Sequence, residues 1–212
     1  MQIKFSKTTF AIVVAAVTMS LVLGFIISEA RLAKRREFVT REIYAKAGLV
    51  MGDLYVVQFS SAAAPEVITE MLHLLVDAGA PTNWLILVEC DLQSQGWEQI
   101  GRMHWLRHIS LQRTNATDRD LDSISELSHL YSLSLTGTRI TDVGIEKLSK
   151  LKELRDLQVG GTEVSEAQLL KLKEKLPLLD VNQTIVNLRD SRKQPRNGDN
   201  QKPVQITAPL VI

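Results

Sequence analysis

A spacing of 24 residues constrains this chain more than any other feature of its sequence. Leu106, Leu130, Leu154 and Leu178 stand 24 residues apart, and apolar residues recur three and five positions after them. These two further columns contain Ile109, Leu133, Leu157 and Val181, and then Leu111, Leu135 and Val159. Self-similarity with a fixed period of this size is typical of proteins that stack copies of one small folding unit. We therefore expect a repeat protein with one continuous core.

Each repeat unit combines two hydrophobic periods. Apolar residues alternate with other residues over the first six positions, which predicts a strand with one buried face. Apolar residues three positions apart in the second half predict a helical turn. These helical columns contain Trp97, Leu121, Ile145 and Leu169, followed by Ile100, Ile124, Leu148 and Leu172. Between strand and helix, Thr117-Asp118, Thr141-Asp142 and Ser165-Glu166 supply oxygens that can cap the first amides of a helix. We expect five stacked units over residues 82–186, with a parallel sheet on one face.

The repeat unit that begins at Leu130 shows the clearest similarity to a known family of repeat proteins. From Leu130 it reads Leu-Tyr-Ser-Leu-Ser-Leu-Thr-Gly-Thr-Arg-Ile-Thr-Asp. This pattern resembles the leucine-rich repeat family, in a 24-residue form with Thr where that family often carries Asn or Cys at the end of the strand. The resemblance implies an α/β solenoid whose strands line a concave face, and a role in recognition. Thr82 replaces the first leucine of the first unit and the pattern ends at Gln183, so both outer units are expected to cap the stack.

The amino-terminal region, residues 1–28, contains a long uncharged stretch. Residues 8–28 are 21 consecutive positions without a charge. As a helix they would span about 30 Å, the thickness of the hydrocarbon core of a bilayer. This predicts a basic tail followed by a transmembrane helix in contact with lipid, and the alternative is a cleaved signal peptide. Five Lys or Arg follow the stretch within thirteen residues and two precede it. The bias predicts a cytoplasmic repeat domain, with an extracytoplasmic one as the alternative.

The remaining segments flank the repeats. Residues 29–48 keep helix-forming residues with Leu32, Val39, Ile43 and Ala47 on one face, which predicts a helical stalk or, alternatively, a coiled coil. Residues 49–81 predict a capping unit, with a strand over 54–59 and a helix over 65–78. Residues 187–212 predict a flexible tail, although 204–212 are apolar again. A basic tail, one membrane segment, a stalk and repeats together resemble bacterial single-pass membrane-anchored leucine-rich repeat proteins.

Strand residues that point away from the core would form the binding surface. We expect it to run from apolar at its amino-terminal end to polar and acidic at the other, which favours a protein or peptide partner with an apolar anchor beside a basic group. The alternative is a face that is merely solvated. The predicted binding residues are Trp84, Ile86, Val88, His108, Ser110, Gln112, Ser132, Ser134, Thr136, Asp156, Gln158 and Asp180.

Other chemistries find little support in the sequence. Residues 42–186 carry thirteen Lys or Arg against twenty Asp or Glu, which argues against nucleic acid as the partner. The single cysteine, Cys90, excludes an intramolecular disulfide and a thiolate metal cluster. The four histidines lack the spacing of a metal site, so no metal or cofactor is expected.

A hydrolase is the remaining catalytic alternative. His108, Ser132 and Asp156 are the residue types of a catalytic triad, but the predicted order places the serine between the other two instead of the histidine. No Gly-x-Ser-x-Gly motif accompanies them. We therefore expect no catalytic residues and no enzyme. The leading hypothesis is a non-catalytic interaction module, and the alternative from another class is a self-associating structural scaffold.

Overall fold

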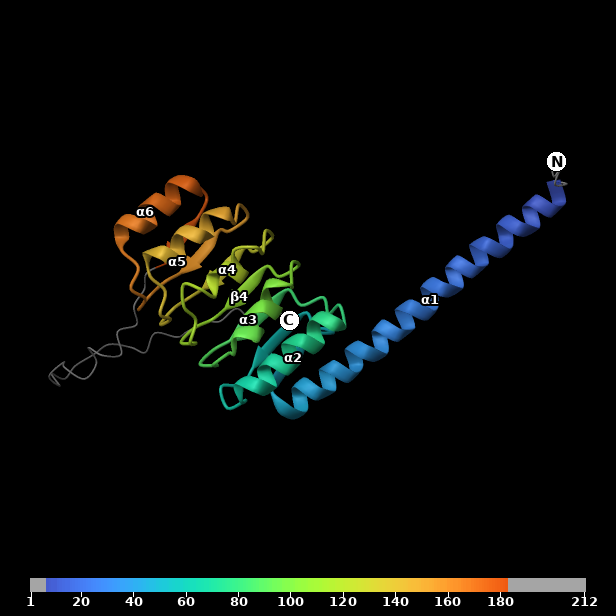
Figure 1. The fold of residues 1–212 in the computed structure, drawn as a ribbon, viewed down its shortest axis with the longest axis horizontal. Helices are drawn as coiled ribbons and strands as arrows, with labels where there is room; N and C mark the ends of the chain where they lie inside the picture. The colour runs from blue at the N-terminus through green and yellow to red at the C-terminus, as the bar shows by residue number, and fades with distance from the viewer. Residues whose placement is uncertain (1–6, 183–212) are drawn as a thin grey trace, which may run out of the picture.

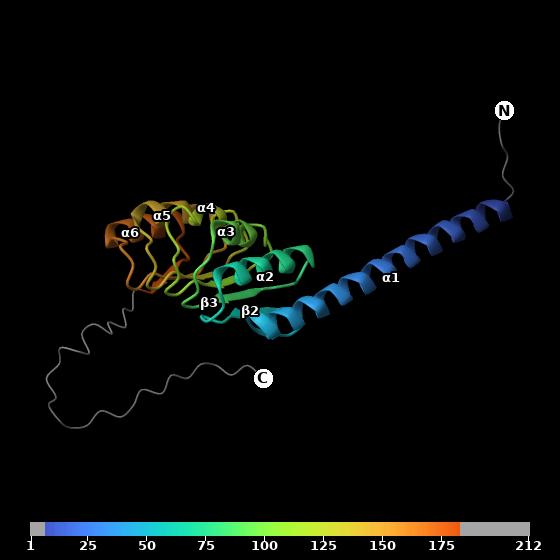
Figure 2. The same ribbon diagram turned by 60° about the horizontal axis from the view of Figure 1, so that its bottom comes forward.

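A computed structural model describes residues 7–182, with side chains described from residue 19 onward. Its centre is a seven-stranded sheet in which the strands follow one another in chain order. Helices α2 to α6 cover one face of this sheet, and α1 projects away from it (Figures 1 and 2). The predicted tail over 187–212, including the apolar stretch 204–212, lies outside the described residues.

The elements alternate regularly along the repeats. The strands are β1 (Gly48–Met51), β2 (Val56–Phe59), β3 (Trp84–Leu87), β4 (His108–Ser110), β5 (Ser132–Ser134), β6 (Asp156–Gln158) and β7 (Asp180–Asn182). The helices are α1 (Lys7–Lys46), α2 (Pro65–Asp77), α3 (Ser94–Gly101), α4 (Leu121–Ile124), α5 (Asp142–Lys147) and α6 (Glu166–Lys175), with a 3-10 turn η1 (Leu148–Lys150) after α5.

The register of the sheet repeats the 24-residue spacing of the sequence. Strands β3 to β7 are parallel, and Ile109 stands beside Leu133, which stands beside Leu157. All three side chains are almost fully buried. The predicted stacking of equivalent residues is therefore confirmed. The preceding strand β2 pairs with β3 in the 28-residue register that brings Val57 beside Leu85.

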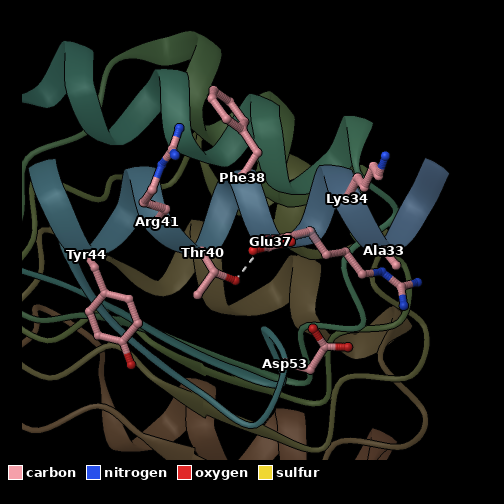
Figure 3. A pocket seen from close by; sticks show the side chains of 9 residues that line it. Ala33, Lys34, Glu37, Phe38, Thr40, Arg41, Tyr44 and Asp53 are labelled. Carbon is pink, nitrogen blue, oxygen red and sulfur yellow. Dashed lines mark hydrogen bonds between the residues drawn. The ribbon is translucent and has the colours of Figure 1, made fainter. Parts of the chain in front are cut away.

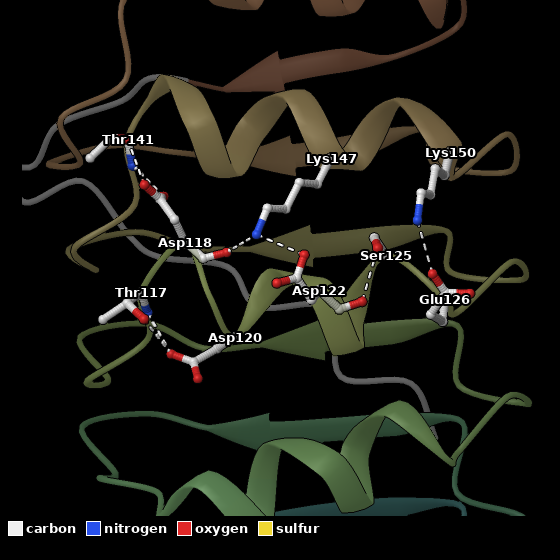
Figure 4. A network of polar contacts seen from close by, with 9 residues as sticks. All are labelled: Thr117, Asp118, Asp120, Asp122, Ser125, Glu126, Thr141, Lys147 and Lys150. Atoms are coloured by element: carbon white, nitrogen blue, oxygen red, sulfur yellow. Dashed lines mark hydrogen bonds and ion pairs between the residues drawn. The ribbon is translucent and has the colours of Figure 1, made fainter.

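Polar side chains tie neighbouring units together at the loops before the helices. The Asp118 carboxylate accepts hydrogen bonds from the Thr141 amide at 2.8 Å and from its hydroxyl at 2.6 Å (Figure 4). One unit later, Asp142 accepts equivalent bonds from Ser165, both at 2.7 Å. A side chain at position 144 would place its Cβ 2.3 Å from an Asp118 oxygen, so Gly144 permits this close approach. The sequence predicted caps within each unit, and the structure adds this ladder between units.

The predicted helix caps are present in the last units. Thr141 Oγ1 accepts from the Val143 amide at 3.3 Å, and Ser165 Oγ accepts from the Gln168 amide at 3.2 Å. Both interactions satisfy an amide at the start of a helix that has no partner within the helix. Thr117 differs, because its amide and hydroxyl donate to Asp120 within the same loop.

Threonines close each turn where the chain leaves a strand. The hydroxyls of Thr114, Thr138 and Thr162 donate to the carbonyls of the residues three positions earlier, at 2.9, 2.6 and 2.7 Å. Cys90 occupies the same column, and its thiol lies 3.4 Å from the Val88 carbonyl oxygen. Burial raises the pKa of the Cys90 thiol, and the carboxylates of Asp91 and Glu89 add to the effect. A raised pKa keeps the thiol protonated, as suits a structural role.

The long helix α1 corrects the expected fold. Over the part of the chain that the structure describes, no helix is long and apolar enough to span a bilayer. The predicted transmembrane helix over 8–28 is therefore wrong, and the fold class is an α/β repeat stack without that element. The cytoplasmic placement of the repeats stays a prediction.

The carboxyl-terminal part of α1 packs on the amino-terminal end of the stack. Val39, Ile43 and Ala47 are buried in the common core. The Arg35 and Arg36 guanidiniums donate to the carbonyls of Asp77 and Gly79, at 3.2 and 3.1 Å. These carbonyls lie at the last residue of α2 and two residues after it, where the helix dipole favours a positive charge. The last third of α1 is thus fixed to the repeats by both apolar and polar contacts.

The sheet begins with a strand that the sequence did not predict. After α1, β1 pairs with β2 in the antiparallel direction, with Gly48 opposite Phe59. A Cβ at Gly48 would lie 1.9 Å from the Gln58 carbonyl oxygen, so only glycine fits there. The turn between β1 and β2 uses positive φ angles at Gly52, Asp53 and Leu54. The predicted strand over 54–59 therefore begins two residues later, at Val56.

Candidate functional site

The outward face of the sheet, which we define as the strand face opposite α2 to α6, brings most of the predicted binding residues together. It contains a cavity of about 470 Å³. The predicted residues that line the cavity are Trp84, Ile86, Val88, His108, Ser110, Gln112, Ser132, Ser134, Asp156 and Gln158. Thr136 and Asp180 are not among its lining residues. The parallel register explains this grouping, since side chains in the same position of successive strands share one face.

Aromatic rings occupy the amino-terminal end of the cavity. Trp84 and His108 stack with ring centroids 3.9 Å apart and an angle of 15° between their planes. Tyr131 meets His108 in a tilted arrangement at 5.8 Å. Trp84 nevertheless keeps 42% of its surface exposed. Sequence reasoning missed Tyr131, because it precedes β5 by one residue and falls outside the outward columns. The position of this aromatic residue directly before a predicted strand was the signal that could have identified Tyr131.

His108 lies in an environment that favours the neutral imidazole. Its Nδ1 atom is buried and has no hydrogen-bond partner among the described residues. Burial lowers the pKa of His108, the nearby Arg107 guanidinium lowers it further, and Asp156 opposes the shift. The neutral ring stacks on Trp84 as an aromatic surface.

Hydrogen bonds between strands order the polar end of the cavity. Ser132 Oγ donates to Asp156 Oδ2 at 2.9 Å, and Ser134 Oγ donates to Gln158 Oε1 at 3.1 Å. Asp180 stands beside Asp156 in the register and is exposed. The two neighbouring carboxylates make this end of the outward face acidic. A basic group on a partner would find both of them within reach.

The geometry does not assemble a catalytic triad. The Ser132 hydroxyl donates to Asp156, while nucleophilic catalysis needs it to donate to a histidine. Neither a bond from His108 Nδ1 to a carboxylate nor a group of three or more metal-ligating side chains occurs among the described residues. The arrangement can bind and orient a ligand through apolar and hydrogen-bonding contacts.

A larger cavity of about 920 Å³ lies along α1 (Figure 3). Sequence reasoning did not predict it, because it forms where α1 passes the turn that carries Asp53. Two of its cationic side chains already have contacts: Arg36 donates to the Gly79 carbonyl, and the Arg41 guanidinium lies 5.7 Å from the centre of the Phe38 ring. These contacts join α1 to the repeats and order its own surface. We therefore take the outward face as the candidate site.

Proteins similar to this chain are found among solved structures and not in the two sequence comparisons. No protein-family model matches the sequence, and no curated protein matches it. Among solved structures, an internalin of Listeria monocytogenes matches 52% of this chain and 36% of its own, with 20% identity and a TM-score of 0.41. Internalin C2 of Listeria monocytogenes matches 60% of each chain, with 15% identity and a TM-score of 0.43. The chain thus spans less than two thirds of either internalin. The resemblance to leucine-rich repeat proteins rests on the 24-residue pattern of the sequence and on the parallel register of β3 to β7.

Proposed function

We propose that this protein is a non-catalytic recognition module that binds a protein or peptide segment on the outward face of its sheet. The observation that carries the proposal is a cavity with an exposed aromatic stack at one end and the Asp156 carboxylate at the other, with Asp180 beside Asp156 on the next strand. Recognition is also the role that the resemblance to leucine-rich repeat proteins suggests.

The aromatic end supplies an apolar contact surface that is ready before a partner arrives. Trp84 is held against His108 instead of folding into the core. Large aromatic side chains contribute much of the binding energy at protein interfaces, because they bury a large area and have few torsions to fix. The side chains of Ile86 and Val88 extend this apolar surface along the same strand and its exit. An apolar side chain of a partner fits here.

The acidic end supplies charge complementarity. Asp156 is oriented by Ser132, so its second oxygen remains available to a donor from a partner. Asp180 adds a second carboxylate on the next strand. A lysine or arginine would form a charge-assisted hydrogen bond with either of them. The preferred partner segment therefore carries an apolar and a basic side chain.

A displayed library of random peptides tests the proposal. We expect the full chain to select peptides that lose at least about tenfold in affinity, or ~1.4 kcal/mol, when Trp84, His108 and Asp156 are all changed to alanine. The matched control carries three alanines at exposed positions on the helix side, Val143, Leu170 and Lys171, and should bind as the original chain does.

Three outcomes would contradict the proposal. Peptides that bind the triple variant and the original equally would show that recognition occurs elsewhere. A self-associating scaffold would instead appear in sedimentation as a concentration-dependent mass that the triple variant does not change. Hydrolysis of a test substrate that disappears in Ser132→Ala would favour the catalytic alternative.

A further inference from the structure

The apolar end of the outward face continues beyond β3 onto β2 and β1. Met51 on β1 stands beside Val56 on β2, which stands beside Trp84, so the three form one row across neighbouring strands. The alternation of burial along β1 places Leu49 and Met51 on the side opposite the buried Val50. Leu49 and Met51 keep 51% and 52% of their surfaces exposed. Sequence reasoning did not include either residue in the binding surface.

A second cavity, of about 640 Å³, joins this extension to the candidate site. Leu49 and Gln58 line it together with Val88, and Val88 also lines the cavity of about 470 Å³. Helices α2 to α6 lie on the other face of the sheet (Figure 2). Contiguous exposed apolar side chains mark interaction surfaces, whereas single ones are ordinary. We define the extended apolar patch as Leu49, Met51, Val56, Trp84 and Ile86.

The chemistry of the extended apolar patch restricts what can bind there. Its side chains offer one hydrogen-bond donor, the Trp84 indole N–H, and no strong acceptor. The strands β2 and β3 beneath it pair on both sides, so their backbone groups are used within the sheet. An extended segment lying across these strands would bury amides and carbonyls that have no partner. An α-helix satisfies its own backbone groups and presents only side chains, so the patch favours a helix.

The spacing of the strands also suits a helix that lies across them. Neighbouring strands are about 4.8 Å apart, and an α-helix advances about 5.4 Å per turn. One face of such a helix therefore places about one side chain on each strand. In an extended segment, side chains on the same side recur only every ~6.8 Å, which does not match the strands.

The row that begins on the extended apolar patch ends on carboxylates. Asp156 and Asp180 stand on β6 and β7, which follow Trp84 by three and four strands. The distance from β2 to the midpoint between β6 and β7 is four and a half steps, or about 22 Å. A helix covers this distance in about 14 residues. A partner helix that carries a basic side chain about 14 residues from the centre of its apolar stripe would meet both ends of the row.

We propose that the partner of the outward face is an amphipathic α-helix that lies across the sheet from β1 to β7. Its apolar stripe packs on Met51, Val56 and Trp84, and its basic end pairs with Asp156 and Asp180. The inference rests on the proposed function and adds two things to it: the conformation of the partner and the participation of β1.

Two designed peptides of the same composition test the conformation. The helical peptide carries leucines at positions i, i+3, i+4 and i+7 and two lysines on the same face about 14 residues away, in a background of alanine and glutamine. The alternating peptide carries its leucines at every second position, as a strand requires. Each is made in both chain directions, and the tighter-binding direction is used, because the row of side chains fixes the stripe and not its direction.

The helical peptide should bind the full chain on the order of tenfold tighter than the alternating peptide, because only its stripe matches the strands. The carbon chemical shifts of an isotope-labelled helical peptide should become those of a helix in the complex.

A pair of variants tests the participation of β1. Leu49→Thr combined with Met51→Thr removes apolar surface, while threonine keeps a residue that favours strands. We expect the helical peptide to bind this variant on the order of tenfold more weakly. The matched control, Val143→Thr combined with Leu170→Thr, removes two exposed apolar side chains on the helix side and should bind as the original chain does. Urea unfolding checks that both variants keep the original stability.

The acidic end has a separate readout. Asp180→Asn should weaken binding of the helical peptide severalfold at low salt and little at high salt, because salt screens exposed charges. Glu98→Gln removes an exposed carboxylate on α3 and serves as the control. A helical peptide with both lysines replaced by glutamine should bind the original chain and Asp180→Asn equally.

Three results would overturn the inference. Tighter binding of the alternating peptide would make the partner an extended segment. Equal binding of the helical peptide to the original chain and to the Leu49→Thr, Met51→Thr variant would exclude β1 from the site. A concentration-dependent mass in sedimentation that this variant abolishes would assign the extended apolar patch to a second copy of the chain.

These experiments separate the inference from the proposed function. If peptides lose binding when Trp84, His108 and Asp156 are changed to alanine but the helical peptide has no advantage, the partner is not a helix and the proposed function stands. If no peptide depends on those three residues, the proposed function is wrong and the inference fails with it.

Discussion

The repeats and helix α1 are both long regular structures, but different information specifies them. In the repeats, most buried residues have a buried equivalent 24 positions away, and the structure places such residues side by side. In α1, no second copy of the pattern exists, and among its residues with described side chains, 19–46, burial is confined to the carboxyl-terminal end. Val39 and Ile43 are buried, whereas Met19 keeps 75% of its surface exposed.

This difference shows which sequence signals are reliable. A repeated column is supported by several independent positions, and an error at one position does not shift the others. An uncharged stretch is a single signal whose meaning depends on its length and surroundings. The stretch from residue 8 to 28 predicted a membrane span, and the structure contradicts it. Predictions that disturb each region separately can test the contrast.

The largest effect is expected for a charge inside the stack. Leu133→Asp places a carboxylate between the buried side chains of Ile109 and Leu157. An unpaired buried charge costs on the order of 4 kcal/mol or more, a large part of the stability of a single domain. We expect loss of the cooperative unfolding transition in urea, followed by circular dichroism. Ser128→Asp, at an exposed position, serves as the control. A folded Leu133→Asp protein would mean that the units do not share one core.

A smaller effect is expected where α1 meets the repeats. Ile43 is fully buried, and Ile43→Ala removes its packing while keeping a helix-forming residue. Such truncations cost about 2–4 kcal/mol. Met19→Ala should change the free energy of unfolding by less than ~0.5 kcal/mol, because the side chain is exposed. Urea unfolding of both variants measures the difference. If Ile43→Ala leaves the free energy of unfolding unchanged, α1 does not unfold cooperatively with the repeats, and the two regions differ more than the structure indicates.

The smallest effect concerns the polar ladder and depends on pH. The Ser165 amide and hydroxyl hold the pKa of Asp142 below its usual value of 3.8. A carboxylate with a lowered pKa in the folded state stabilises the protein above the unfolded value, and this stabilisation disappears as the pH falls through the folded value. The difference in unfolding free energy between the original protein and Asp142→Asn should therefore shrink below about pH 4. Thermal unfolding between pH 3 and 6 measures it.

A matched control separates this effect from general acid destabilisation. Glu98→Gln removes a carboxylate at an exposed position of α3. Its difference from the original protein should stay nearly constant over the same pH range. A pH dependence of the same size in both variants would mean that the Asp142 carboxylate does not stabilise the contact between units.

Much of the candidate site was predictable, because it depends on the same periodicity as the core. Once Ile109, Leu133 and Leu157 point inward, the alternation of a strand sends His108, Ser132 and Asp156 to the other face. Ten of the twelve predicted binding residues line one cavity. Whether they bind a partner stays a prediction.

The contacts between side chains could not be read from spacing. The stack of Trp84 on His108, the tilt of Tyr131 and the choice of Ser132 to donate to Asp156 all depend on rotamers and on the distance between strands. The sequence also did not predict β1, a short strand that pairs with β2. Its formation requires the close approach at Gly48 and a turn with positive φ angles.

The sequence by itself determined the repeat unit, its length and which of its residues face the core. Repetition and alternation are local properties, and each copy of the unit provides independent evidence for them. Only the tertiary structure decided where α1 packs, how the sheet begins and which polar groups join across units. These features arise from single contacts between segments that are distant in the sequence. Each such contact occurs once, so no second copy of the pattern indicates it.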